Sequence, residues 1–155
     1  MPAWQHTYRI ERTPEQVFDV VGTHLFENHP RWEPEVEELR PLTDGPIGVG
    51  SRALMVRRDM GRRSEVAYEI IAFEPGRRVS VTHVGTRMAF DLTFELAPEG
   101  TGATEFTARV RMAGRGIARA LNPLIALQLA GRSDRLSRAT VRVIEEQTAA
   151  ALAVA

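Results

Sequence analysis

The most constraining feature of this sequence is a change of period near Gly114. Before it, apolar residues alternate with polar ones over 87–96 and again over 103–112, a pattern typical of strands with one buried side. After it, apolar residues recur every three or four positions, which predicts one long amphipathic helix from Asn122 to about residue 151. Gly131 interrupts this stripe, and we expect it to mark a kink or a close contact.

The residues before these strands predict further short elements. A strand is expected over 4–12, followed by a helix whose start, Thr13-Pro14-Glu15-Gln16, has the pattern of a capping box with a first-turn proline. A second short helix or turn is expected over 25–32. From residue 36 onward, turns rich in Gly, Pro and Asp separate segments of strand length, which indicates hairpins and therefore an antiparallel sheet.

Together these elements predict an α+β fold. A curved antiparallel sheet of about seven strands is expected, with two short helices after the first strand and a long C-terminal helix packed across its apolar face. The chain of 155 residues has the length of one domain, 1–155. A curved sheet wrapped on one helix leaves a gap, and we expect an apolar ligand cavity there.

Composition excludes several classes of function. Twenty basic and twenty acidic side chains balance, whereas nucleic-acid binding needs a basic excess, so no nucleic-acid partner is expected. No cysteine is present, which excludes disulfides and thiolate chemistry, and every basic residue is arginine, which excludes lysine Schiff bases. No apolar signal core opens the chain and no stretch reaches about 20 apolar residues, so a cytoplasmic protein without stable membrane insertion is expected.

The cavity should be lined by the inward side chains of the strands, by one residue of the second helix and by the last helix. The predicted lining consists of Trp32, Met55, Tyr68, Ile70, Val81, His83, Met88, Phe90, Leu92, Phe106, Met112, Leu121, Leu124, Ile125 and Gln128. Tyr68 and His83 are the candidate catalytic residues, because a tyrosine hydroxyl can donate to a ligand carbonyl and the ordinary pKa of histidine suits a general base. The alternative for both is a buried side chain satisfied by a neighbour.

Other polar residues point to no metal and no cofactor. His24 and His29 are five residues apart, which misses the i, i+4 spacing of a helical zinc pair. Arg57 and Arg109 are expected on the solvent-facing side of the sheet, although alternation leaves two registers open for the strand with Arg57. The arginines of the last helix fit either a solvated face with salt bridges or contact with an anionic headgroup or membrane surface.

Five motifs follow one another in a recognisable order: PEQVFDVV at 14–21, NHPRWEP at 28–34, GPIGVGSR at 45–52, FEPGRRV at 73–79 and GATEFT at 102–107. In this order and spacing the chain resembles the SRPBCC superfamily, which includes START-type lipid-binding domains and polyketide cyclase/dehydrase-like proteins. The resemblance covers nearly the whole chain and implies a single START-like domain with the helix-grip fold. In members that cyclise polyketides, an inward arginine and tyrosine polarise carbonyls; no such set is clearly carried by these residues.

Three functions are compatible with this sequence. The first is binding of a hydrophobic or amphipathic small molecule, such as a lipid, polyketide or aromatic metabolite, in the internal cavity. The second is a polyketide cyclase, aromatase or dehydratase that uses inward polar residues of the same cavity, so enzyme activity is an open question. The third is a protein-interaction module with a filled core, which a cavity above roughly 300 Å³ would argue against. Homodimerisation through a sheet edge or the arginine-rich helix is also open.

Overall fold

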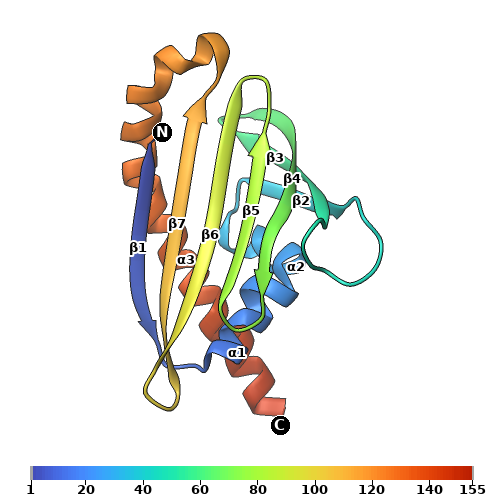
Figure 1. The fold of residues 1–155 in the computed structure, drawn as a ribbon, viewed down its shortest axis with the longest axis vertical. Helices are drawn as coiled ribbons and strands as arrows, with labels where there is room; N and C mark the ends of the chain where they lie inside the picture. Colours follow the sequence, from blue (N-terminus) through green and yellow to red (C-terminus); the bar gives the residue numbers. More distant parts are fainter. Residues whose placement is uncertain (1, 155) are drawn as a thin grey trace.

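The computed structural model describes residues 2–154 and has the predicted α+β architecture (Figure 1). The elements in chain order are β1(Ala3–Ile10), α1(Pro14–Phe18), the π-helical segment η1(Asp19–Thr23), α2(Leu25–Trp32), β2(Val36–Pro41), β3(Arg52–Asp59), β4(Arg62–Glu74), β5(Arg78–Val84), β6(Met88–Glu99), β7(Ala103–Gly114), the 3-10 segment η2(Gly116–Leu121) and α3(Asn122–Val154). The predicted seven-stranded sheet, two short helices and long final helix are therefore confirmed.

The strands form one antiparallel sheet in the order β1-β7-β6-β5-β4-β3-β2. Strands β2 to β7 follow one another as a meander. Strand β1 pairs with β7, so β1 and β2 are the two edge strands of the sheet. The register shifts between Val36 and Glu38 and between Ile70 and Ala72, where bulges bend the sheet. The helix α3 runs along one face of the sheet, and α1 and α2 lie on that same face (Figure 1).

The first helical turn forms as the capping-box pattern predicts. The Thr13 hydroxyl accepts from the Gln16 backbone N–H at 3.3 Å, and the Gln16 side chain accepts from the Thr13 backbone N–H at 2.9 Å. The helix continues through η1 past Gly22, where an added Cβ would lie 2.5 Å from the ring of Phe18. Glycine is therefore required there because the Phe18 ring occupies the space of a side chain.

A kink or a close contact was expected at Gly131, and the close contact is wrong. Helix α3 runs unbroken through this position, and nothing outside the local helix backbone lies within 4 Å of a Cβ placed on it. No packing partner therefore accounts for a glycine at this position.

The packed core lies between the sheet and the two short helices. Val17, Val21 and Leu25 from α1, η1 and α2 are buried in one cluster with Tyr68 and Ile70 of β4. The C-terminal half of α3 adds Val143 and Ile144 to this cluster. The first half of α3 faces β6 and β7 instead, and the packing there is incomplete.

Candidate functional site

A cavity of about 170 Å³ lies between the first half of α3 and the inner faces of β6 and β7. Its walls are formed by His29, Trp32, Glu33, Met55, Arg57, Met88, Phe90, Leu92, Phe94, Ala108, Val110, Met112, Ile125, Gln128, Leu129, Arg132, Ser133, Leu136, Ser137 and Thr140. Met88 and Gln128 line the cavity and are also exposed, so the cavity opens to the surface beside them. A volume above roughly 300 Å³ would argue against the protein-interaction module with a filled core. The cavity is smaller than that, so it does not argue against this alternative.

Eight of the predicted lining residues border the cavity. They are Trp32, Met55, Met88, Phe90, Leu92, Met112, Ile125 and Gln128. The alternation of β6 and β7 accounts for Met88, Phe90, Leu92 and Met112, because residues two apart on a strand face the same side, whereas Ile125 and Gln128 follow from the apolar stripe of α3. Whether these side chains contact a ligand remains a prediction.

The other seven predicted residues do not line the cavity. Tyr68, Ile70, Val81 and Phe106 are at most 3% exposed and belong to the packed core. Phe26 of α2 packs against Tyr68, and Phe18 of α1 packs against Phe73 of the same strand, so these two helices fill the space over β4.

Leu121, Leu124 and His83 are excluded from the cavity for other reasons. Leu121 and Leu124 are 53% and 51% exposed. Leu121 belongs to η2, where the 3-10 geometry shifts side-chain directions away from those extrapolated back from α3. The Nδ1 of His83 donates to the carbonyl of Ala67 at 2.6 Å, and its ring packs against Phe90.

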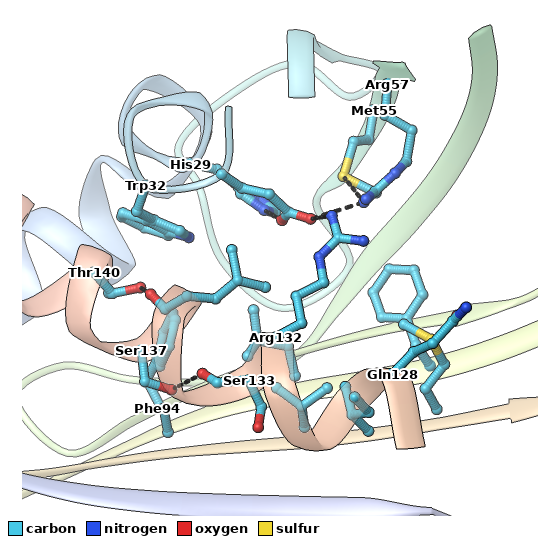
Figure 2. Close-up of a pocket in the computed structure, with 18 of the residues that line it drawn as sticks. His29, Trp32, Met55, Arg57, Phe94, Gln128, Arg132, Ser133, Ser137 and Thr140 are labelled. Carbon is cyan, nitrogen blue, oxygen red and sulfur yellow. Dashed lines mark hydrogen bonds and ion pairs between the residues drawn. The ribbon is translucent and has the colours of Figure 1, made fainter. Parts of the chain in front are cut away.

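One edge of the cavity carries a group of charged side chains, the polar cluster, which consists of His29, Glu33, Arg57, Asp59 and Arg132. The Glu33 carboxylate accepts from His29 Nε2 at 2.8 Å and from Arg57 Nη1 at 2.9 Å. Arg57 also donates to the two oxygens of Asp59, at 2.7 and 2.9 Å. Figure 2 shows His29, Arg57 and Arg132 converging on this edge from α2, β3 and α3.

The expected solvent-facing position of Arg57 is wrong. Ala53, Met55, Arg57 and Asp59 share the inner face of β3, and Arg57 follows Met55 into the cavity wall. Its side chain is only 16% exposed, and two carboxylates compensate the buried charge. Arg109 does lie outside, paired with Glu95 at 2.9 Å.

The electrostatics of the polar cluster keep Glu33 ionised. Burial by itself raises the pKa of Glu33, but the hydrogen bond from His29 and the nearby positive charges outweigh burial and lower the pKa to about 2. For Asp59, the hydrogen bonds from Arg57 are the largest effect, and they hold its pKa below the ordinary value. The positive charges of Arg57 and Arg132 are therefore balanced by two ionised carboxylates, those of Glu33 and Asp59.

Arg132 has unused hydrogen-bonding capacity. Its Nη2 lies 3.5 Å from Glu33, 3.4 Å from Glu35 and 3.5 Å from Asp59. These are ion-pair distances, yet its Nε and Nη2 are buried and make no hydrogen bond within the described part of the chain. Buried donors without acceptors are uncommon in folded proteins, so Arg132 is a cavity-lining residue with hydrogen-bonding capacity to spare.

His29 is already committed to protein partners. Because Glu33 is ionised, Nε2 of His29 carries the proton that it shares with that carboxylate. The opposite nitrogen, Nδ1, lies 3.5 Å from the Tyr68 hydroxyl, which is a weak contact. Burial raises the pKa of Tyr68, and the charge of Glu33 raises it further, so its hydroxyl keeps its proton.

The cavity wall formed by α3 exposes fewer polar atoms than its serine and threonine residues would suggest. Ser137 and Thr140 line the cavity, but each hydroxyl donates at 2.8 Å to the backbone carbonyl four residues earlier in the helix (Figure 2). These side chains therefore present mainly carbon to the cavity.

The polar cluster was missed in the sequence, although one local signal was present. His29 and Glu33 have the i, i+4 spacing that brings side chains together on a helix. No local pattern connects Arg57 and Arg132 to them, since their approach depends on how α2, β3 and α3 pack. Among residues 2–150 no group of three or more potential metal-ligating side chains comes together.

Comparisons with known proteins agree with this fold. Residues 1–145 match the model of a family described as polyketide cyclase / dehydrase and lipid transport. No curated protein matches the chain at a significant level. Within the described residues, no helix is both long enough and apolar enough to traverse a bilayer.

Several solved structures have a similar fold. A START superfamily protein from Mycobacterium smegmatis has a TM-score of 0.73 at 16% identity, covering 94% of this chain and 98% of that one. A protein from Thermus thermophilus has a TM-score of 0.73 at 17% identity, covering 94% and 99%. The Zhui aromatase/cyclase from Streptomyces sp. R1128 has a TM-score of 0.71 at 12% identity, covering 94% and 92%. At these identities the likeness establishes the fold alone.

Proposed function

This chain belongs to the polyketide cyclase / dehydrase and lipid transport family, within the SRPBCC superfamily, and we propose that it binds a small apolar compound bearing one neutral oxygen acceptor. The observation that carries the proposal is an apolar cavity with two unused donor atoms of Arg132 at one edge. The ring or chain of the ligand would pack against Phe90, Leu92 and Phe94, while its oxygen accepts from Arg132.

Size and charge narrow the class of ligand. A cavity of about 170 Å³ is similar to engineered apolar cavities of about 150 Å³ that bind benzene. A compound of one or two rings suits this volume better than a diacyl lipid. Glu33, Glu35 and Asp59 already surround Arg132, so a ligand carboxylate would add a further negative charge there, whereas a phenol, ketone or ester oxygen would not.

The first test is native mass spectrometry of the purified protein, with organic extraction of any compound that co-purifies. The affinity test is fluorescence titration with the matched probes 1-naphthol and naphthalene. We expect 1-naphthol to bind roughly 10-fold more tightly, because a hydrogen bond to a charged donor is worth about 1.5 kcal/mol or more. Equal affinities would contradict a role for Arg132 in recognition.

Three variants separate the two parts of the proposed site. Arg132→Met should remove the preference for 1-naphthol and leave naphthalene affinity within about twofold, whereas the exposed Arg138→Met on the same helix should change neither. Leu92→Trp should fill the cavity and abolish binding of both probes, whereas Ile71→Trp, at a position 50% exposed, should not. Retained binding in Leu92→Trp would place the probes elsewhere.

The polar cluster also favours a second candidate, a cyclase or dehydratase. Arg132 could polarise a ketone oxygen while Glu33 accepts a proton, and both border the cavity. This candidate ranks second because a carboxylate with a pKa of about 2 is a weak base and both His29 nitrogens face protein partners. The catalytic roles predicted for Tyr68 and His83 are not favoured, since neither side chain borders the cavity.

Incubation with a short poly-β-keto thioester, followed by mass spectrometry, tests the second candidate. Loss of one water at a rate above the uncatalysed reaction, abolished in Glu33→Gln, would support enzyme activity. Conversion at the same rate with and without the protein would leave ligand binding as the function.

A further inference from the structure

Four large apolar side chains are exposed at the end of the molecule where η2 leads into α3. They are Ile117, Leu121, Leu124 and Leu127, which are 98%, 53%, 51% and 73% exposed, and we name them the mouth patch. They fall within eleven consecutive residues, whereas scattered single apolar residues are normal on protein surfaces. A cluster of this kind on a helix end indicates an interaction surface.

The mouth patch borders the opening of the cavity. Ile125 and Gln128 lie on the same turns of α3 and line the cavity from inside. Figure 1 shows β7 leading to η2 and the start of α3 at one end of the sheet, where the turn between β5 and β6 also lies. Arg115 fastens these segments together, because its Nη1 donates to the Gly85 carbonyl at 2.8 Å and its backbone N–H to the Arg87 carbonyl at 2.9 Å.

The charge around the mouth patch has one sign. Residues 106–133 contain five arginines and no aspartate or glutamate, in a chain whose formal net charge is zero. Arg87, Arg115 and Arg119 are exposed near the patch, and none of them forms an ion pair with a carboxylate of the described residues. The other three arginines of this segment are paired: Arg109 and Arg111 with carboxylates of β6, and Arg132 with the carboxylates beside the cavity.

We propose that the mouth patch docks peripherally on the surface of an anionic lipid bilayer, with the cavity opening toward the membrane. Exposed leucines on a helix with flanking arginines are the combination that interfacial binding requires, since apolar burial and attraction to anionic headgroups act together. A second copy of the chain suits the patch less well, because a two-fold contact would gather the unpaired Arg115 and Arg119 of both copies in one interface. Docking of this kind needs no membrane-crossing helix and does not rest on the ligand proposed above.

Co-sedimentation of the full chain with lipid vesicles tests the proposal. Vesicles of phosphatidylcholine mixed with phosphatidylserine should bind the protein roughly 100-fold more tightly than vesicles of phosphatidylcholine alone, since each of three arginines contributes about fivefold. Raised salt should remove most of this difference. Absence of binding to the anionic vesicles, or equal binding to both, would overturn the proposal.

Matched variants assign the binding to the patch. Leu124→Ser/Leu127→Ser should lower affinity for anionic vesicles at least 10-fold, and Arg87→Gln/Arg119→Gln should reduce the dependence on phosphatidylserine. Val49→Ser, at a position 69% exposed in the loop between β2 and β3, and Arg138→Gln on the far half of α3 should bind as the unaltered chain does. Equal loss in the control variants would overturn the assignment.

Two further measurements separate the alternatives. Circular dichroism and thermal unfolding establish that each variant folds. The affinity for 1-naphthol should be unchanged in the patch variants. Failure of membrane docking is therefore distinguishable from failure of the cavity proposal. A concentration-dependent dimer, dissociated by Leu124→Ser/Leu127→Ser in a chain that binds no vesicles, would show that the patch joins two copies and would overturn membrane docking.

Discussion

Replacing Glu33 by glutamine tests the electrostatic account of the site most directly. Glutamine keeps the shape of the side chain but removes the charge that His29, Arg57 and Arg132 surround. Folding lowers the pKa of this carboxyl from about 4.5 to about 2, so the folded state favours the ionised form. The stabilisation is complete above about pH 4.5 and is lost as the pH falls toward 2.

The size of the effect follows from these two values. At about 1.4 kcal/mol for each pH unit between them, the ionised carboxylate contributes about 3 kcal/mol to the free energy of unfolding at pH 7. At pH 3 the same linkage leaves about 1 kcal/mol. Glu33→Gln should therefore be less stable than the unaltered chain by about 3 kcal/mol at pH 7, and the gap should narrow to about 1 kcal/mol at pH 3.

Urea unfolding at several pH values measures this gap. Trp32 is a suitable fluorescent probe, since it is 3% exposed and its ring centroid lies 5.5 Å from that of His29. Glu37→Gln is the control, because its pair with Arg58 is about half exposed and should be worth less than about 1 kcal/mol at any pH. A gap that does not change between pH 7 and pH 3 would refute the proposed ionisation of Glu33.

Three other outcomes are expected. Gly131→Ala should raise the free energy of unfolding by about 1 kcal/mol in thermal or urea unfolding, because alanine favours the helix and has room there. Gly114→Ala should instead lower the free energy of unfolding, since its Cβ would lie 2.1 Å from a backbone oxygen of η2. Thr13→Ala should lose about 1 kcal/mol with the capping box, and an unchanged midpoint would show that the cap contributes nothing. Ultraviolet titration at pH 10.5 should show little phenolate in the folded chain, and both tyrosines should ionise on unfolding. Burial first, and then the hydrogen bond to Asp134, raise the pKa of Tyr8 to about 12. Burial raises the pKa of Tyr68 as well.

Much of the fold was predictable because its signals are local. The alternation over β6 and β7 and the stripe of α3 each depend on residues within a few positions of one another, and the capping pattern at Thr13 lies within a single turn. The Ile70/Ala72 bulge and the η2 segment carry no comparable signal. Leu121, which lies in η2, was consequently assigned to the cavity although it is 53% exposed.

The apolar lining of the candidate site was partly predictable, whereas its polar cluster was not. Met88, Phe90 and Leu92 face the cavity because strand alternation dictates it, but which part of the inner face stays unfilled depends on where α1 and α2 pack. The polar cluster joins three elements that are far apart in the chain, so no window of sequence contains it. Arginine was expected in solvent on general grounds, and only the carboxylates around Arg57 make its position inside favourable.

The hydroxyls of Ser137 and Thr140 allow the α3 wall of the cavity to change from apolar to polar. Each is held by a carbonyl of its own helix rather than by another element, so rotation about one side-chain bond frees it without moving any backbone. A ligand with an acceptor at that level could recruit a hydroxyl, and a hydrocarbon would leave both folded back. The same cavity can in this way bind ligands with and without an acceptor at that level. Single substitutions such as Ser137→Ala or Thr140→Val would narrow the range of ligands while the helix stays in place.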